Sequence, residues 1–346
     1  MKVNAKHPEI EKIRMASQVI RRGGTVAFPT ETVYGLGADA LNAKAVKAIF
    51  VAKKRPPDNP LIVHVASMGE VYRLASEVPK DAEKMMAKFW PGPLTLILKR
   101  SRAVPDITVA GLDTVAIRMP DNKVALALIT ESMTPIAAPS ANIAGRPSPT
   151  TAKHVEEDLA GRIDIILDAG PTRIGVESTV IDMTVDPPQI LRPGGIAYEK
   201  IHRIFGRVRL PPVVLARKED RHLRARSPGM RHRHYAPNAE VIVVEGKPKA
   251  VAGKIRELIG IHAGRGKRVG VMATDESRSK FAADVVKSLG SRRDPATIAK
   301  NLFRSLRDMD EEKVDVIIAE GIRPRGIGLA VVNRLRKASG FNIVKA

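Results

Sequence analysis

A long stretch without a sustained apolar period divides the sequence into two parts. Residues 207–238 are rich in arginine and proline, and compact domains seldom contain structureless connections of roughly thirty residues. The parts on either side are both long enough to form a domain. We therefore predict a first domain over residues 8–206, a basic linker over residues 207–238 and a second domain over residues 239–346.

The first part alternates short apolar runs with helical patterns. Residues 9–22 place apolar side chains on one helical face, and residues 25–28 form an apolar run that is typical of a buried strand. Further strand-like runs lie at 61–65, 94–98, 115–118, 136–138, 163–167, 178–182 and 189–192, and further helical patterns at 44–54 and 79–89. Because the runs are too irregularly spaced for a repeated strand–helix–strand unit, we predict an α/β domain around a mixed, twisted sheet.

The second part has a more regular alternation. Strand-like runs occur at 241–244, 268–272 and 314–319, and helical patterns at 248–260, 278–289, 295–309 and 329–338. Strands that alternate with helices in this way predict a small, open, Rossmann-like parallel sheet.

Composition excludes several classes of protein. The sequence has no cysteine, which excludes disulfide scaffolds, thiolate zinc sites and cysteine nucleophiles. No apolar run is long enough to span a membrane, and the N-terminus lacks the apolar core of a signal peptide. We therefore expect a cytoplasmic protein without a membrane contact.

The charge points to an anionic partner. The formal net charge is +21, as expected for a protein that binds nucleotides or RNA. Most of the excess lies beyond residue 200, where a weak RNA contact and a merely solubilising surface are equally good explanations. Only 3% of the residues are aromatic, too few to stack single-stranded nucleic acid well.

The familiar phosphate-binding and metal-binding motifs are missing. The segment Tyr34-Gly35-Leu36-Gly37 has only two of the three glycines of a dinucleotide-binding turn. Gly326-Ile327-Gly328 opens a predicted helix, and a tight strand-to-helix turn explains it better than an anion site. No group of residues has the spacing of a metal site, so we expect none on the protein.

Four polar stretches follow or precede predicted strands. Two are cationic and two are rich in hydroxyl groups, and together they have the composition of a crevice for an anionic ligand. The stretches are residues 29–37, residues 53–61, residues 138–148, and residues 177–180 with 191–194.

These stretches resemble the motifs of the threonylcarbamoyl-AMP synthase family, whose catalytic part is the YrdC-like domain, in the long form with a C-terminal domain. The resemblance runs over nearly the whole chain. It rests on Lys53-x-Arg55, Ser140-x-Asn142, Pro29-Thr30-Glu31-Thr32-x-Tyr34-Gly35-Leu36, Ser178-Thr179, Arg192-Pro193-Gly194, Ser227-Pro228-Gly229-Met230 and His234-Tyr235-Ala236-Pro237.

The resemblance implies that L-threonine, bicarbonate and ATP are converted to threonylcarbamoyl-adenylate and pyrophosphate. Mg²⁺ would be carried with ATP. The partner that takes the product would be a separate tRNA threonylcarbamoyl transferase, which modifies an adenosine of tRNA.

The resemblance also implies roles for individual residues. Lys53 and Arg55 would act on the triphosphate as the catalytic cations, and His234 and Tyr235 would face inward from a lid formed by the linker. The threonine pocket would include Thr32, His64, Arg118 and Ser178, with Arg118 on the carboxylate. The nucleotide side would include Asn59, Thr114, Ala138, Ser140, Asn142, Ser148 and Arg192. A histidine buried in the core is as good an explanation of His64 as a ligand contact.

Two other functions are open to a chain with these features. A basic α/β domain could bind double-stranded RNA or tRNA through phosphates without catalysis, although residues 1–200 are close to neutral. Carbamoyltransferases of hydrogenase maturation contain a similar domain. They also need cysteine-rich zinc motifs, which this sequence lacks.

Overall fold

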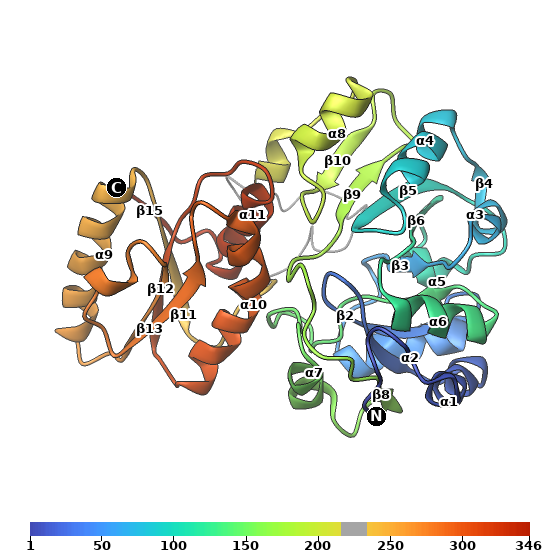
Figure 1. The fold of residues 1–346 in the computed structure, drawn as a ribbon, viewed down its shortest axis with the longest axis horizontal. Helices are drawn as coiled ribbons and strands as arrows, with labels where there is room; N and C mark the ends of the chain where they lie inside the picture. Colours follow the sequence, from blue (N-terminus) through green and yellow to red (C-terminus); the bar gives the residue numbers. More distant parts are fainter. Residues whose placement is uncertain (216–233) are drawn as a thin grey trace. The chain divides into compact units, whose positions relative to one another are not determined.

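The computed structural model describes residues 1–215 and 234–346 (Figure 1). Its described residues fall into two compact units. The first consists of residues 1–144 and 148–211, and the second of residues 145–147, 212–215 and 234–346. Within the described residues no helix is long and apolar enough to cross a lipid bilayer.

The first unit is built on a mixed sheet of ten strands, counted over the described residues. The strands are β1 (Val26–Pro29), β2 (Tyr34–Asp39), β3 (Ile62–His64), β4 (Ala75–Glu77), β5 (Leu94–Arg100), β6 (Thr114–Arg118), β7 (Ile136–Ala137), β8 (Ile165–Ile166), β9 (Thr179–Asp182) and β10 (Gln189–Arg192). They lie in the order β10-β9-β5-β6-β3-β7-β2-β1-β8, with β4 beside β5. Parallel pairs such as β3–β6 occur together with antiparallel pairs such as β5–β6, which confirms the predicted mixed sheet.

Helices of the first unit cover this sheet. They are α1 (Ile10–Arg21), α2 (Ala43–Lys53), α3 (Met68–Leu74), α4 (Lys80–Phe89), α5 (Asp106–Val109), α6 (Lys123–Ser132), α7 (Ala152–Leu159) and α8 (Tyr198–Phe205). Helices α1 and α6 pack on each other and on β1 and β7, through a buried cluster that includes Ile13, Phe28 and Leu128. Helix α2 packs on β2 and α5.

The predicted polar loop over residues 29–37 is wrong in its second half. Tyr34–Asp39 form strand β2, which pairs antiparallel with β1. Gly37 lies in this strand because a Cβ there would come within 2.6 Å of Ile136 and Phe28. Close packing of the sheet, and not a nucleotide-binding turn, explains this glycine.

The second unit has a parallel sheet of five strands among its described residues, in the order β13-β12-β14-β11-β15. Its strands are β11 (Glu240–Glu245), β12 (Val269–Thr274), β13 (Val285–Gly290), β14 (Val316–Glu320) and β15 (Ile343–Lys345), and its helices are α9 (Pro248–Ala263), α10 (Pro295–Glu311) and α11 (Gly328–Ala338). Helix α9 covers one face, and α10 and α11 lie together on the other (Figure 1). The predicted Rossmann-like parallel sheet is therefore confirmed.

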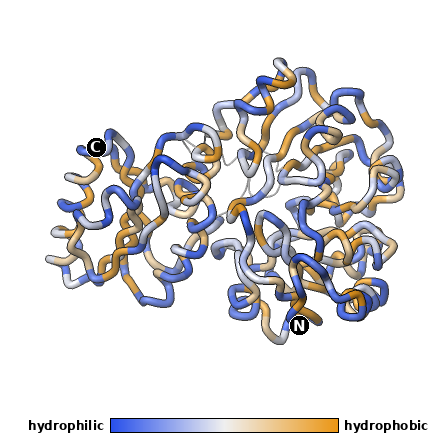
Figure 2. The backbone as a smooth tube through the Cα atoms, viewed as in Figure 1, coloured by the Kyte–Doolittle hydropathy of each residue, from blue (hydrophilic) through white to orange (hydrophobic). Residues whose placement is uncertain are grey.

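Apolar residues concentrate in the strands of both sheets (Figure 2). In the second unit the face toward α9 buries Ile242, Val244 and Ile255 among others. Gly326, with φ +59°, lies in the turn before α11, and Gly328 begins that helix, so the tight-turn interpretation of this glycine pair holds.

The helix predicted over residues 278–289 is wrong. A short 3₁₀ turn at Arg278–Lys280 is followed by strand β13, which pairs with β12 at one edge of the sheet. Phe281, Val285 and Leu289 are buried at a spacing of four residues, which imitates one face of a helix. Tertiary pairing with β12 overrides that pattern.

Candidate active site

Strand β6 and its neighbour β3 bring Arg118 and His64 together. Side chains alternate along a strand, so Thr114, Ala116 and Arg118 share one face of β6. The parallel register pairs Ala116 with Ile62 and Arg118 with His64. Ile62 and Ala116 belong to a buried apolar cluster with Ile97 and Val180. Arg118 and His64 therefore stand side by side beyond an apolar patch of the sheet.

The turn between β1 and β2 also reaches Arg118. The Thr30 hydroxyl donates to the carbonyl oxygen of Val33 at 2.6 Å, and the hydroxyls of Thr30 and Thr32 lie 2.8 Å apart. Arg118 Nη1 donates to Thr32 Oγ1 at 3.1 Å, and its Nη2 lies 2.6 Å from Oε2 of Glu31. The turn thus places Thr32 on the arginine that the sequence analysis assigns to the threonine carboxylate.

His64 is buried beside this cation, and only 3% of its surface is exposed. Burial, and then the charge of Arg118, lower the pKa of His64 to about 3. Its Nδ1 has no hydrogen-bond partner among the described residues. A buried ring nitrogen without a partner is unusual in a purely structural histidine, and the ligand contact of His64 stays a prediction.

Helix α2 ends where the cationic motif begins. Lys54 adopts the left-handed conformation, with φ +51°, and ends the helix at Lys53. The Lys53 ammonium donates to the carbonyl oxygen of Ser140 and, at 2.5 Å, to that of Asn142. The Ala144 amide donates back to the carbonyl oxygen of Lys53 at 2.9 Å. These contacts hold the two motifs together through the main chain of residues 140–144, a role that the sequence analysis does not predict for Lys53.

Arg55 lies against the turn that follows α2. Its Nη2 donates to the carbonyl oxygens of Asn59 at 2.9 Å and Pro60 at 3.3 Å. The side-chain oxygen of Asn59 is buried and has no hydrogen-bond partner in the described part of the chain. Arg55 and Asn59 are therefore neighbours, as their common assignment to the nucleotide requires.

A third group surrounds Ser178 at the start of β9. Its hydroxyl lies 2.7 Å from that of Thr95, and Arg192 donates to it through Nη2 at 3.1 Å. Arg192 Nε also donates to the Ser178 carbonyl oxygen at 3.1 Å. Gly194 is needed here, since a Cβ would lie 2.3 Å from the backbone carbon of Ser178 and the nitrogen of Thr179. Two distant motifs, Ser178-Thr179 and Arg192-Pro193-Gly194, thus form one contact.

The remaining predicted nucleotide residues are tied to this framework. Ser148 Oγ donates to Oε1 of Glu177 at 2.7 Å, and Glu177 directly precedes Ser178 in the chain. The Ala138 amide donates to the carbonyl oxygen of Ile62 at 2.9 Å. Ser140 bridges to Gly35 at the start of β2. The predicted residues named so far thus form contact groups around Arg118, Lys53, Arg55 and Ser178. Thr114 is the exception, because it begins β6, at the opposite end of the strand from Arg118, and pairs with Lys99.

His234 and Tyr235 pack within the second unit. The Tyr235 ring stacks on Phe303 of α10, with 5.2 Å between the ring centroids. The Arg334 guanidinium lies over the Tyr235 ring, 5.5 Å from its centroid. The His234 and Tyr235 rings lie 5.7 Å apart. These contacts explain why Tyr235 is buried, and the lid role of both residues stays a prediction. The motif at residues 227–230 lies outside the described residues.

Sequence reasoning missed three polar residues of these groups. Glu31 pairs with Arg118, Thr95 with Ser178, and Glu177 with Ser148. Glu31 and Glu177 lie inside the polar stretches, and a carboxylate beside predicted cations was a usable signal. Thr95 lies within an apolar strand pattern, and nothing in its local sequence distinguishes it.

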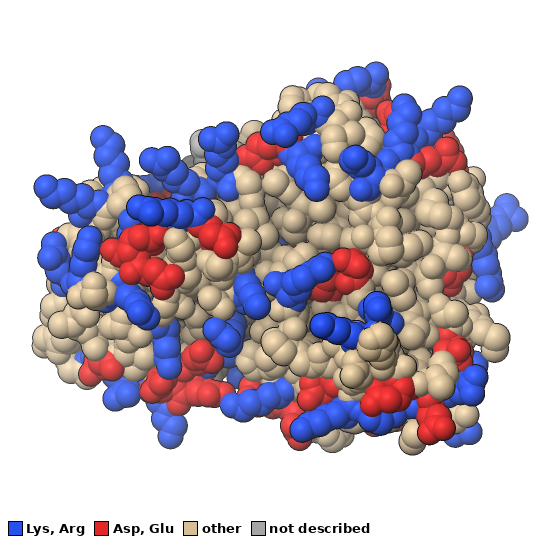
Figure 3. Space-filling model, viewed as in Figure 1, with Lys and Arg blue, Asp and Glu red and all other residues tan. Residues whose placement is uncertain are grey.

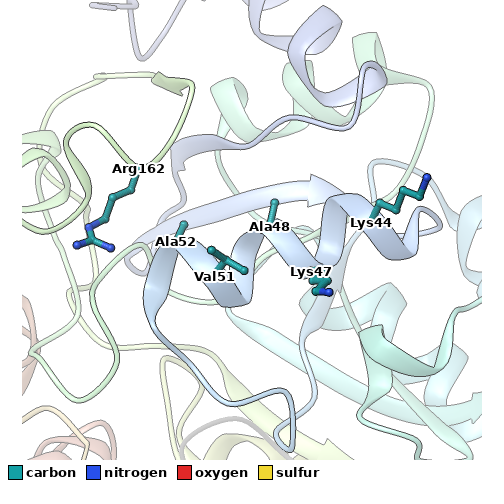
Figure 4. Close-up of a pocket in the computed structure, with 6 residues that line it drawn as sticks. All are labelled: Lys44, Lys47, Ala48, Val51, Ala52 and Arg162. Carbon is teal, nitrogen blue, oxygen red and sulfur yellow. The ribbon is translucent and has the colours of Figure 1, made fainter.

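A separate hollow lies on the outer side of α2 (Figure 4), with a volume of about 470 Å³. It is lined by Lys44, Lys47, Ala48, Val51, Ala52 and Arg162. None of its three cations forms an ion pair within residues 1–215 and 234–346, and Val51 is 67% exposed. The described residues contain no group of three side chains suited to a metal ion.

Known proteins resemble this chain over its full length. Residues 18–194 match a family model described as telomere recombination, and residues 196–340 match one described as the C-terminal domain of threonylcarbamoyl-AMP synthase. The threonylcarbamoyl-AMP synthase of Pyrococcus abyssi is 55% identical over 96% of both chains. That of Bacillus subtilis is 49% identical over 96% of this chain and 94% of its own.

A solved structure agrees with these matches. The crystal structure of P. abyssi Sua5 complexed with L-threonine has a TM-score of 0.95 and 54% identity, and the match covers 100% of this chain and 99% of that one. Fold, motifs and full-length identity all agree. The chain therefore belongs to the threonylcarbamoyl-AMP synthase family.

Proposed function

We propose that this chain is an L-threonylcarbamoyladenylate synthase, a nucleotidyltransferase that makes threonylcarbamoyl-AMP and pyrophosphate from L-threonine, bicarbonate and ATP. Membership of the family supports this activity. The observation that carries the assignment of the site is the contact of Arg118 with Thr32, which joins two of the four residues assigned to threonine. Mg²⁺ enters as part of the ATP substrate, with phosphate oxygens and water as its ligands.

The reaction brings negatively charged reactants together. Bicarbonate takes up a proton and gives carbon dioxide and water, and the threonine amine adds to the carbon dioxide and loses a proton to form a carbamate. A carbamate oxygen then attacks the α-phosphorus of ATP, and pyrophosphate leaves. Positioning and charge stabilisation carry transfers of this kind, and no covalent intermediate on the protein is needed. The residues therefore have to hold two anions in line.

The threonine side of the site is assigned to the group around Arg118. A guanidinium can bind a carboxylate through two parallel hydrogen bonds, so Arg118 is assigned to the threonine carboxylate. Thr32, His64 and Ser178 are assigned to the same pocket, with His64 uncharged. An uncharged imidazole can accept or donate a hydrogen bond without repelling a cationic neighbour.

The nucleotide side is assigned to the cations of the other groups. Arg55 and Arg192 bind phosphate oxygens, and Lys53 fixes the main chain of residues 140–144 and adds positive charge beside it. The base and ribose are assigned to Asn59, Thr114, Ala138, Ser140, Asn142 and Ser148. His234 and Tyr235 are assigned to a lid that excludes water from the hydrolysable adenylate.

The proposal extends to the partners and organisation of the chain. A separate tRNA threonylcarbamoyl transferase takes the product in the cytoplasm, and RNA contacts this chain weakly. Residues 8–206 form the catalytic domain, residues 207–238 the linker and residues 239–346 the C-terminal domain. On the face drawn in Figure 3, basic side chains are spread among acidic ones and do not form one stripe, which favours the enzyme over a protein that only binds RNA.

Mass spectrometry of the product formed from threonine, bicarbonate and ATP tests this function. We expect threonylcarbamoyl-AMP from the unmodified protein and a strong loss with Lys53→Ala and Ser140→Ala. Lys47→Ala, on the outer side of the same helix as Lys53, is the matched control. A protein that makes no product and still binds tRNA in a salt-sensitive way would be the binding protein instead.

A further inference from the structure

Glu31 is a buried carboxylate to which the proposed mechanism gives no task. Its side chain is 1% exposed, that of Arg118 is 4% exposed, and Glu31 Oε2 lies 2.6 Å from Arg118 Nη2. Neither oxygen of Glu31 has a hydrogen bond of good geometry among the described residues. Arg118 is thus the ion-pair partner that the structure gives this carboxylate.

The guanidinium of Arg118 is held at each of its nitrogens. Nε donates to the carbonyl oxygen of Gly92 at 3.3 Å, Nη1 donates to Thr32 Oγ1 at 3.1 Å, and Nη2 faces Glu31. An arginine side chain has five N–H donors in one plane. Because these three contacts fix that plane, the donors that remain on Nη1 and Nη2 keep a constant direction.

A charge in such a place needs a counter-charge. An unpaired guanidinium that is removed from water is strongly destabilising. Strand β6 itself supplies no carboxylate, because its residues are Thr, Val, Ala, Ile and Arg. Glu31, from the turn between β1 and β2, supplies the negative charge. It can therefore keep the arginine in one orientation before a substrate arrives.

We propose that Glu31 is a positioning residue, which aims the guanidinium of Arg118 at the carboxylate of the amino-acid substrate. This inference rests on the proposed function, because that function assigns the threonine carboxylate to Arg118. Glu31 acts through Arg118 and has no contact of its own with threonine. Loss of the Glu31 carboxylate should therefore weaken recognition of the substrate carboxylate by Arg118 more than it changes any other property of the enzyme.

Steady-state kinetics of Glu31→Gln test the role. We expect KM for threonine to rise about tenfold or more, since misaimed groups lose catalysis steeply, while KM for ATP stays within about twofold. Glu31→Asp keeps the charge on a shorter side chain and should restore part of the loss. Glu320→Gln is the matched control, because Glu320 is equally buried and lies 2.6 Å from Arg292 in the second unit.

Threoninamide, which lacks the carboxylate, separates positioning from general damage. The preference for threonine over threoninamide, measured as the ratio of the two kcat/KM values, should fall about tenfold in Glu31→Gln and by less in Glu31→Asp. A variant that is only destabilised would lose activity on both substrates equally and keep the ratio, and this result would overturn the inference. Glu31→Asp gives the answer if Glu31→Gln does not fold. If the unmodified protein makes no threonylcarbamoyl-AMP, the proposed function fails first.

Discussion

Glu31 and Arg118 form an ion pair with 2.6 Å between Oε2 and Nη2, and both side chains are almost completely buried. Glu320 and Arg292 of the second unit have the same separation. Glu320 also accepts hydrogen bonds from the amide and hydroxyl of Thr274 and from Ser277. The oxygens of Glu31 have no hydrogen bond of good geometry among the described residues. The pair in the candidate site is thus the less completely satisfied one, as functional sites often are.

Arg118→Lys should weaken threonine use strongly. A lysine keeps the charge but cannot bind a carboxylate through two fixed donors. Hydrogen bonds to charged groups contribute about 1.5–3 kcal/mol, so we expect kcat/KM for threonine to fall about ten- to a hundredfold. Pyrophosphate release at varied threonine and saturating ATP measures this effect.

Arg292→Lys provides the control for that change. It makes the same substitution in the ion pair of the second unit, which contains none of the residues assigned to threonine, and should leave KM for threonine unchanged. A normal KM for threonine in Arg118→Lys would show that Arg118 does not bind the carboxylate.

Much of the fold could be predicted because local patterns and tertiary structure agree. Residues 9–22, 44–54 and 79–89 show helical periodicity, and helices α1, α2 and α4 lie there. The helix predicted over residues 278–289 is wrong, because the buried residues there repeat every four positions as in a helix while strand pairing with β12 decides the structure. Very short elements such as β4 and α5 offer too few residues for a period to be recognised.

The candidate site was predictable where its residues lie in dense polar stretches. Arg118 and Thr32 are 86 residues apart, and no local pattern says that Nη1 of one meets Oγ1 of the other. The family resemblance supplied that link. The role of the Lys53 ammonium on main-chain oxygens could not be foreseen, because every residue offers a carbonyl and sequence does not show which one is near.

His64→Gln should make the free energy of unfolding less dependent on pH. In the folded protein His64 stays uncharged down to a pKa of about 3, whereas a histidine of the unfolded chain takes up a proton near pH 6.5. The unfolded state therefore binds more protons between these values, and stability falls as pH falls, by up to about 1.4 kcal/mol per pH unit.

Thermal unfolding between pH 7.5 and 4.5 measures this contribution. We expect Tm to decrease less on acidification in His64→Gln than in the unmodified protein. His7→Gln, which removes an exposed histidine, is the control and should show the same decrease of Tm as the unmodified protein. Parallel pH profiles of all three proteins would contradict the uncharged state of His64.

Gly194→Ala should disturb the group around Ser178. The added Cβ would lie 2.3 Å from the backbone of Ser178 and Thr179, so the segment that carries Arg192 has to move away. Displacement of a positioning group by about 1 Å can cost about a hundredfold in rate. We expect kcat/KM for ATP to fall by up to that factor, while Gly253→Ala on α9, where a Cβ meets nothing within 4 Å, leaves activity intact.

The hollow on α2 provides a test of the weak RNA contact. Lys44, Lys47 and Arg162 line it and have no ion-pair partner within the described residues, and its floor is formed by Ala48, Val51 and Ala52 (Figure 4). Each cation that neutralises a phosphate of duplex nucleic acid contributes about −0.9 to the slope of log K against log salt. If RNA docks here, replacing all three cations by alanine should reduce the magnitude of that slope by about 2–3 units.

Fluorescence anisotropy of labelled tRNA at several salt concentrations measures the slope. The triple variant should keep full synthase activity without tRNA, because none of the three residues belongs to the candidate site. A triple alanine substitution at Lys2, Lys6 and Arg22, which are exposed on the first unit, removes the same charge elsewhere. Equal slopes of log K against log salt in the two triple variants would mean that RNA binding depends on the net charge of the protein, and that RNA does not dock in the hollow.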